Sequence, residues 1–282
     1  MVPEAEASVS GTFQISEGGD SVRGWRDGGD CVDIGTWDSE SKTCTLTSDV
    51  TGQIIIGNNG FTLDGNGHTF TGIQETFWFN GARLLDGTGQ PRTQYTHSTH
   101  QQHSGSLFVL NSVEVTVKNI QFTKSYSGHG FKILGVGWCS NCEPTVISGN
   151  TFATTGGASG GLYIGNYYVD WTSNTIQDGA GSSSNVQVTS NTFLVPNSAL
   201  EVYASSFYYA TPDGISITDN TFSGGGSSEI FQLRADIPVT VSGNTFNGIA
   251  SNERGLALYP KSSTGSEQIG GHTITGNTFS GS

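Results

Sequence analysis

The stretch VTVSGNTF at residues 239–246 recurs along the chain with small changes. Apolar residues alternate in it with polar ones, then a small residue and an Asn follow, and an aromatic residue ends the phrase. Alternation is the pattern of a half-buried β-strand, and a Gly-Asn or Ser-Asn pair breaks a strand into a bend. The near-copies are VISGNTF (146–152), VDWTSNTI (169–176), VQVTSNTF (186–193), ISITDNTF (215–222) and HTITGNTF (272–279). The sequence therefore predicts an all-β protein built from one repeated unit.

The spacing of the copies predicts a solenoid. Measured between the last apolar residues of successive copies, with two weaker copies upstream, the intervals are 52, 30, 24, 17, 29, 24 and 33 residues. Several fall near the roughly 20–30 residues of one β-solenoid coil. We expect the longest interval to hold an insertion and the shortest coil to lack a strand. The aligned residues are Phe70, Phe122, Phe152, Ile176, Phe193, Phe222, Phe246 and Phe279.

Stacked coils would bring identical side chains together. Asn side chains in register can hydrogen-bond to one another and to the neighbouring backbone, and Phe side chains can stack in the interior. The expected ladder is Asn150, Asn174, Asn191, Asn220, Asn244 and Asn277. One Thr follows each of these asparagines, which gives a rank of Thr151, Thr175, Thr192, Thr221, Thr245 and Thr278.

Length and charge exclude several classes of protein. The chain has 282 residues, enough for one domain with a substantial core, and only 12% of them are charged, which argues against disorder. The net charge of −13 argues against a nucleic-acid partner, because binding to phosphates needs clustered Lys and Arg. No run of about 18 apolar residues is present, so we expect no membrane insertion.

The four cysteines fall in two local pairs, Cys31 with Cys44 and Cys139 with Cys142. Local, even pairing is typical of disulfides in an oxidising compartment. We therefore expect two disulfides and a secreted or cell-surface protein. Two pairs of free thiols in a cytosolic protein are the alternative.

Two stretches resemble a known family. FTLDGNGHTFTG (61–72) and SLFVLNSVEVTVKNIQF (106–122), with the xNTF units, are similar to right-handed parallel β-helix proteins of the pectate-lyase-like fold, and closest to NosD-type repeats. The resemblance covers about residues 42–282 and implies a single-domain right-handed parallel β-helix. This fold hosts lyases, hydrolases, epimerases, adhesins and structural proteins, so the resemblance implies no single activity.

The remaining segments are interpreted around that solenoid. Residues 1–41 lack the repeat, and we expect them to form an N-terminal cap, because a solenoid must close its open end. Residues 42–282 would then form the β-helix. The stretch 73–104 is expected to be an inserted loop that lies over one face, with Trp78 contributing to a substrate groove. Loops of this length are uncommon and often functional.

A further strand precedes each Asn phrase. When SLFVL, GFKIL, GLYIG, ALEVYA, IFQLRA and GLALYP are stacked in register, every second residue points outward. One outward column contains Phe108, Lys132, Tyr163, Glu201, Gln232 and Ala257, and the next contains Leu110, Leu134, Gly165, Tyr203, Arg234 and Tyr259. With coils about 4.8 Å apart, these columns predict a patch of charged and aromatic side chains.

This patch is the predicted functional site. An Arg can neutralise the carboxylate of a uronic acid, and a neighbouring base can then remove the adjacent proton. We predict catalytic roles for Glu201, Tyr203, Arg234, Lys132 and His129, and substrate binding by Tyr163, Gln232, Tyr259 and Trp78. The expected protein is a monomeric, carbohydrate-active lyase or C5-epimerase for an acidic polysaccharide. We expect no metal site, and Ca²⁺ is the only cofactor considered.

Other functions remain open at this point. Lys132 and Arg234 lie several coils apart, too far for one sugar, and Glu201 with Arg234 is also compatible with a plain cross-coil ion pair worth about 0–1 kcal/mol. Glu201 with Asp213 or Asp236 would suit a glycosidase. A non-catalytic adhesin or structural protein is the main alternative, and ice binding by the Thr rank is a narrower one.

Overall fold

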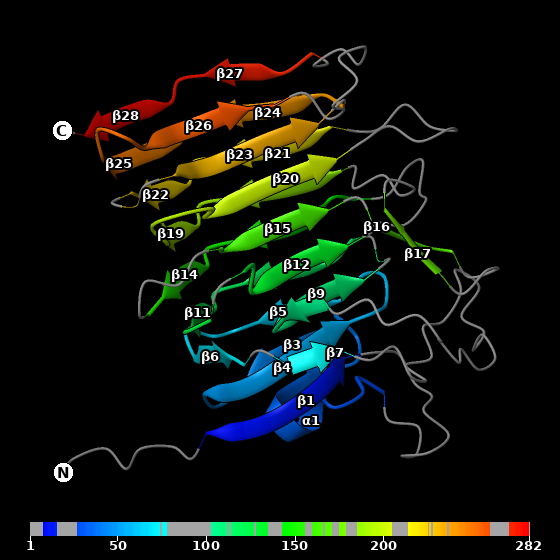
Figure 1. Ribbon diagram of the computed structural model, residues 1–282. Helices are drawn as coiled ribbons and strands as arrows, with labels where there is room; N and C mark the ends of the chain where they lie inside the picture. Colours follow the sequence, from blue (N-terminus) through cyan, green and yellow to red (C-terminus); the bar gives the residue numbers. More distant parts are fainter. Residues whose placement is uncertain are drawn as a thin grey trace, which may run out of the picture.

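The computed structural model describes residues 8–15, 27–73, 75–77, 103–110, 112, 114–126, 128–134, 143–155, 160–165, 167–170, 175–178, 185–204, 214–224, 226, 228–235, 237–259 and 271–281. Apart from one short helix, α1 (Cys31–Ile34), the regular structure in these ranges consists of strands. Most of the strands pair in parallel, as expected for a solenoid-like all-β protein. The first and last strands, β1 (Val9–Ile15) and β28 (Thr278–Gly281), lie at opposite ends of the stack (Figure 1).

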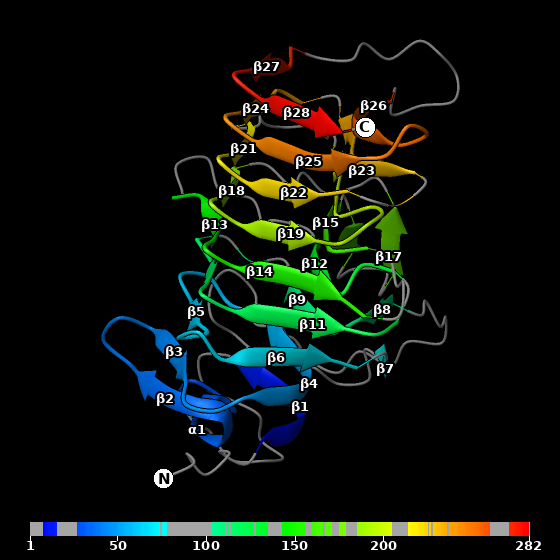
Figure 2. The same ribbon diagram turned by 90° about the vertical axis from the view of Figure 1, so that its left-hand side faces the viewer.

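A complete coil of the chain passes through three strands, and equivalent strands of successive coils pair to form three rows. Row 1 contains β3 (Thr43–Leu46), β5 (Thr62–Asp64), β10 (Thr116–Lys118), β13 (Thr145–Ser148), β18 (Val186–Thr189), β21 (Ile215–Thr218), β24 (Val239–Ser242) and β27 (Thr273–Thr275). Row 2 contains β6 (Thr69–Gly72), β11 (Gln121–Lys124), β14 (Thr151–Thr154), β19 (Thr192–Leu194), β22 (Thr221–Ser223), β25 (Thr245–Ile249) and β28 (Thr278–Gly281). Row 3 contains β9 (Leu107–Leu110), β12 (Phe131–Leu134), β15 (Leu162–Gly165), β20 (Leu200–Ala204), β23 (Glu229–Ala235) and β26 (Arg254–Leu258). Figure 2 shows row 2 from outside, with row 1 beside it.

The first strands join the rows at the N-terminal end. In β4 (Val50–Ile56), residues 50–52 pair with β6 and residues 54–56 pair with β9, so rows 2 and 3 form one continuous sheet. Strand β1 (Val9–Ile15) pairs in parallel with the whole of β4. Helix α1 leads into β2 (Gly35–Asp38), which pairs antiparallel with β3. The division into a cap of residues 1–41 and a helix of residues 42–282 stays a prediction.

One of the two expected disulfides lies within the described part of the chain. Cys31 of α1 is bonded to Cys44 of β3, and both residues are fully buried. A disulfide is typical of an extracellular environment. Cys139 and Cys142 lie outside the described residues.

Two pairs of antiparallel strands lie outside the three rows. Strands β7 (Glu75–Phe77) and β8 (His103–Gly105) pair at the two ends of the predicted 73–104 insertion. Strands β16 (Tyr167–Asp170) and β17 (Thr175–Asp178) pair between β15 and β18. The phrase VDWTSNTI therefore does not form a coil, because its Ile176 pairs with Val169 of its own hairpin. The predicted short coil at this phrase was wrong: β14 pairs directly with β19.

The interior contains the predicted Phe stack and Asn ladder without the copy at 169–176. From Phe152 to Phe279 successive rings are 4.6–4.7 Å apart and within 8° of parallel. The Asn side chains donate one to the next at 2.9–3.0 Å and also hold backbone groups of the bends. The ladder runs through Asn150, Asn191, Asn220, Asn244 and Asn277, and Asn174 lies outside the described residues.

Helix α1 has four residues and is far too short to cross a membrane, and the described ranges contain no helix that is long and apolar enough to do so.

Candidate functional site

The outward residues of row 3 form the predicted columns over β12, β15, β20 and β23, whereas Ala257 of β26, predicted to point outward, is buried at 7% exposure. Residues between them point inward and are at most 1% exposed, as expected when side chains alternate across a sheet. The inward residues are Ile133, Ile164, Val202 and Leu233. Strand pairing places Lys132, Tyr163, Glu201 and Gln232 in one column, and Tyr203 beside Arg234 in the next. These six side chains are half-buried, so each retains contact with solvent.

His129 reaches this surface from the bend before β12. Its Nε2 atom lies 3.6 Å from Glu201 Oε2, although β20 is two strands further along row 3. The coil between them carries Gly160 and Gly161 at this point. A Cβ atom added to Gly160 would lie 2.7 Å from the backbone nitrogen of His129, and one added to Gly161 would lie 2.3 Å from the backbone carbonyl oxygen of Ala199. Two adjacent glycines therefore let the backbones of the three coils pack closely at this point.

The imidazole of His129 is neutral at physiological pH. Burial, with smaller effects of the Lys132 and Lys124 charges, lowers the pKa of His129 to about 3, and a hydrogen bond to the Ser198 backbone opposes this shift. Nε2 has no hydrogen-bond partner, so we assign the proton to Nδ1, which donates to Ser198. Nε2 thus presents a lone pair to Glu201, and the contact is not an ion pair.

The carboxyl of Glu201, which faces this histidine, also has a shifted pKa. Burial raises the pKa of Glu201 above that of a free carboxyl, and the Arg234 charge lowers it by a smaller amount. A protonated Glu201 can donate to the Nε2 lone pair, whereas two facing acceptors would repel. Two groups that can take up a proton therefore lie within 3.6 Å of each other, which is an arrangement suited to proton transfer.

The Arg234 side chain is held in place by its neighbours, but not all of its N–H groups have hydrogen-bond partners. Its Nη2 donates to Gln232 Oε1 at 3.3 Å, and Gln232 Nε2 donates to Ser198 Oγ at 3.3 Å. The guanidinium carbon lies 4.8 Å from the centre of the Tyr259 ring, in a cation–π contact. Its Nε–H is buried and has no hydrogen-bond partner. Within the described residues Arg234 forms no salt bridge, so its partly exposed guanidinium can bind an anion without breaking one.

Tyr259 is held in place by a carboxylate that sequence reasoning missed. The Tyr259 hydroxyl donates to Glu229 Oε1 at 2.6 Å, and Arg254 Nη1 donates to the same oxygen at 2.7 Å. Ser228 Oγ donates to Glu229 Oε2 at 2.6 Å. The Ser228 and Tyr259 hydrogen bonds lower the pKa of Glu229 to about 2. No motif marks Glu229, because its role depends on the neighbouring coil.

Lys132 and Tyr163 extend the surface toward the N-terminal end. Burial lowers the pKa of Lys132 to about 8. The Tyr163 ring packs 5.3 Å from the His129 ring and occupies space that a side chain at Gly165 would need, since a Cβ there would lie 2.0 Å from the ring. Lys132 and Arg234 are three strand steps apart, about 14 Å along the stack, so one sugar unit cannot contact both.

Three predicted residues cannot be placed. Trp78, assigned to substrate binding, and Asp213 and Asp236, considered for glycosidase chemistry, lie outside the described residues. In the described ranges, no cluster of three or more His, Cys, Asp or Glu side chains has the geometry to hold a metal ion.

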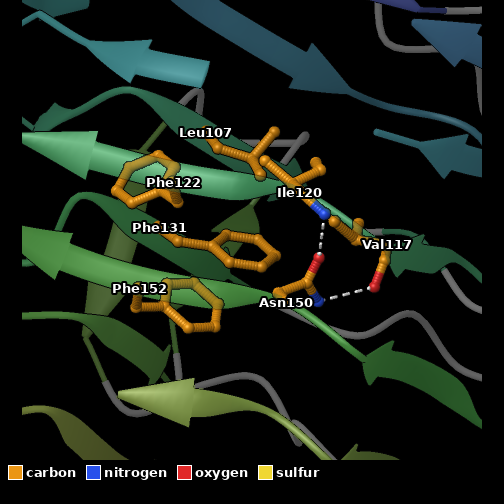
Figure 3. A pocket seen from close by; sticks show the side chains of 7 residues that line it. All are labelled: Leu107, Val117, Ile120, Phe122, Phe131, Asn150 and Phe152. Atoms are coloured by element: carbon orange, nitrogen blue, oxygen red, sulfur yellow. Dashed lines mark hydrogen bonds between the residues drawn. The ribbon is translucent and has the colours of Figure 1, made fainter. Parts of the chain in front are cut away.

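The interior offers no alternative site where coils 106–134 and 143–165 meet. A small space there is lined by Leu107, Val117, Ile120, Phe122, Phe131, Asn150 and Phe152 (Figure 3). It is too small for a water molecule. The one polar side chain, Asn150, is engaged: its Oδ1 accepts from the Ile120 N–H, and its Nδ2 donates to the Val117 carbonyl, both at 3.0 Å.

No family model, curated protein or solved structure matches the chain, so its function has to be inferred from the site itself.

Proposed function

We propose that this protein is a secreted, single-domain right-handed parallel β-helix of the pectate-lyase-like type that acts on an acidic polysaccharide by lyase or C5-epimerase chemistry. The proposal rests on one observation: the His129–Glu201 contact lies beside an unsaturated Arg234 on a solvent-accessible strand surface. A proton acceptor next to a cation is what abstraction of a proton adjacent to a carboxylate requires.

Each residue has a role in the proposed reaction. Arg234 neutralises the uronate carboxylate, which lowers the energy of the carbanion formed at C5. The carboxylate of Glu201 takes the C5 proton, and the lone pair of His129 Nε2 then receives that proton from it. In an elimination, the C5 electron pair forms the C4=C5 double bond, the C4–O bond breaks, and Tyr203 protonates the leaving oxygen. In an epimerisation, a proton returns to the opposite face of C5.

The neighbouring residues bind the rest of the sugar chain. Tyr163 and Tyr259 offer aromatic surfaces on either side of Glu201, and Gln232 offers an amide between them. Lys132 lies two strand steps from Glu201, about 10 Å away, so it would pair with the carboxylate of a neighbouring uronate. None of these roles requires a cofactor, and Ca²⁺ would act only as a bridge between acidic groups. A monomer is sufficient, because every residue named belongs to one chain.

The proposal is tested with polyuronides. The protein is mixed with alginate, pectate and related polymers, and the absorbance of unsaturated uronates and the epimer content by NMR are followed. We expect activity on at least one polymer, a loss of at least about 100-fold in kcat for Glu201→Gln, and a comparable loss for Arg234→Met. Thr240→Ser, on the exposed face of β24, is the control and should keep full activity. Absence of both activities on every polyuronide would refute the proposal.

A second candidate, recognition of an ordered neutral surface such as ice without catalysis, is favoured by the register of row 2. Thr151, Thr192, Thr221, Thr245 and Thr278 pair in succession along five strands, with one hydroxyl per coil. These strands and β13, β18, β21, β24 and β27 contain no charged residue. Thr175 does not belong to this rank, because it pairs within the β16–β17 hairpin. Thermal hysteresis that disappears in Thr221→Tyr would support this candidate, and none in the wild type would eliminate it.

A further inference from the structure

Lys124 is buried inside the stack, where charged side chains are rare. It ends β11 and points inward with 2% of its surface exposed. Its ammonium donates to the carbonyl oxygens of Tyr126 at 2.7 Å and Gly128 at 2.6 Å, and it lies 4.8 Å from the centre of the Tyr126 ring. A buried charge is costly unless hydrogen bonds compensate for its lost hydration. Its two carbonyl contacts lie in the bend that leads to His129.

The surroundings of Lys124 are tightly built. A Cβ on Gly130 would lie 2.6 Å from Lys124 Cδ, so the residue after His129 is a glycine that makes room for the lysine. The Tyr126 hydroxyl is hydrogen-bonded to Ser106 Oγ, which itself donates to the Ile73 carbonyl at 3.1 Å. The backbone carbonyls of the bend, at Tyr126 and Gly128, are therefore held from the inside by Lys124, and Ser106 anchors only the Tyr126 side chain.

We propose that Lys124 is a positioning residue for His129: by fixing the carbonyls of Tyr126 and Gly128, it fixes the backbone that carries the imidazole across the intervening coil to Glu201. The importance of His129 for catalysis rests on the function proposed above, but the positioning itself does not. Without the ammonium, both carbonyls would be buried without a partner and the bend would have to rearrange.

Electrostatics gives the proposal a second, measurable consequence. The groups that face His129 are the Glu201 carboxyl, the Tyr163 ring, the Ser198 carbonyl, and the Lys132 and Lys124 charges. Both lysine charges lower the pKa of His129. Removal of the Lys124 charge should therefore raise the pKa of His129, and loss of the bend geometry should expose the ring and raise it further.

The test is an NMR titration of the His129 side-chain nitrogens in the full-length protein. In the wild type we expect a neutral ring with the proton on Nδ1 down to about pH 4, which follows from a pKa of about 3. In Lys124→Met we expect the pKa of His129 to rise by about one unit or more, together with a change of the Nδ1 signal. Tyr126→Phe is the matched control: it deletes a buried hydrogen bond to Ser106 but leaves both carbonyls, so His129 should titrate as in the wild type.

The outcomes separate positioning from simple packing. If Lys124→Met folds and the His129 pKa and tautomer are unchanged, the inference is wrong. If Lys124→Met does not fold, Lys124→Gln decides, because its amide can still donate to both carbonyls without charge: an unchanged Nδ1 tautomer supports the inference, and a changed tautomer contradicts it. The titration needs no substrate, so inactivity on polyuronides would refute the proposed function alone.

Discussion

His129 Nε2 lies 3.6 Å from Glu201 Oε2, although the two residues belong to coils separated by a complete coil. In a stack with strands about 4.8 Å apart, side chains normally contact only the adjacent coil. Between them, at Gly160 and Gly161, the backbone of the middle coil packs directly against the backbone of both neighbouring coils. Both side chains are largely withdrawn from water, at 15% and 20% exposure, and burial shifts the pKa of each toward its neutral form.

Acid should destabilise the protein through His129. Its pKa is about 3 in the folded protein and about 6.5 in an unfolded chain, so between these values the unfolded chain binds more protons. The free energy of unfolding contributed by His129 therefore falls as the pH falls through this window, by up to about 1.4 kcal/mol per pH unit. Urea unfolding between pH 7 and pH 4 should show the slope, and His129→Gln should reduce it.

The contribution of Glu201 to the pH dependence of stability has the opposite sign, and the variant Glu201→Gln is the control. Its folded-state pKa is raised, so its contribution to stability is complete below its unfolded pKa and is lost as the pH rises. Glu201→Gln should therefore steepen the loss of stability in acid. An identical pH profile for His129→Gln and the wild type would show that His129 is not buried as described.

Replacement of Lys132 by Met should stabilise the fold. Burial lowers the pKa of Lys132 to about 8, which means that the folded protein disfavours the ammonium. At pH 7 we expect the free energy of unfolding to rise by about 1–3 kcal/mol, and this gain should shrink between pH 8 and pH 10 as the wild-type lysine loses its proton. Lys118→Met is the control: Lys118 pairs with Asp64 at 3.2 Å near the surface, and its loss should cost about 0.5 kcal/mol or less. A destabilised Lys132→Met would contradict the prediction.

Substitutions in the middle of the Asn ladder should destabilise the protein more than substitutions at its end. Asn220 is 1% exposed; its amide donates to Val188, Thr218 and Asn244, and its Oδ1 accepts from Asn191. Asn220→Ala should lower the free energy of unfolding by about 2–4 kcal/mol, because several buried backbone groups lose their partners. Asn277→Ala, in the last coil described, should lower the free energy of unfolding by less than half of that amount. Equal losses in guanidinium unfolding would argue against a continuous ladder.

The disulfide should stabilise the N-terminal end. Cys31 and Cys44 close a short loop with a sequence separation of 13, for which about 2–3 kcal/mol is expected. Reduction, or the double change Cys31→Ala with Cys44→Ala, should lower the unfolding free energy by this amount. Cys139→Ala with Cys142→Ala is the comparison variant. If reduction left the stability of the wild type unchanged, the disulfide would have no stabilising role.

Local sequence predicted the strands well and their partners less well. VTVSGNTF and VDWTSNTI share the same alternation, yet the first forms a coil and the second a hairpin whose Ile176 pairs with Val169. Alternation reports which residues favour a strand with one buried face, but it contains no information about which strand lies alongside. The direct pairing of β14 with β19 therefore appeared only in the folded protein.

The sequence by itself determined the coil: strand, Asn bend and inward aromatic residue, and with it the outward columns that bring Glu201 beside Gln232 and Tyr203 beside Arg234. These follow from the two-residue period of a strand and one unit per coil. Only the tertiary structure decided that His129 meets Glu201, that Glu229 anchors Tyr259 and that Lys124 lies beneath the bend. The reason is physical: bends have no fixed period, and their side-chain contacts depend on the clearance between coils.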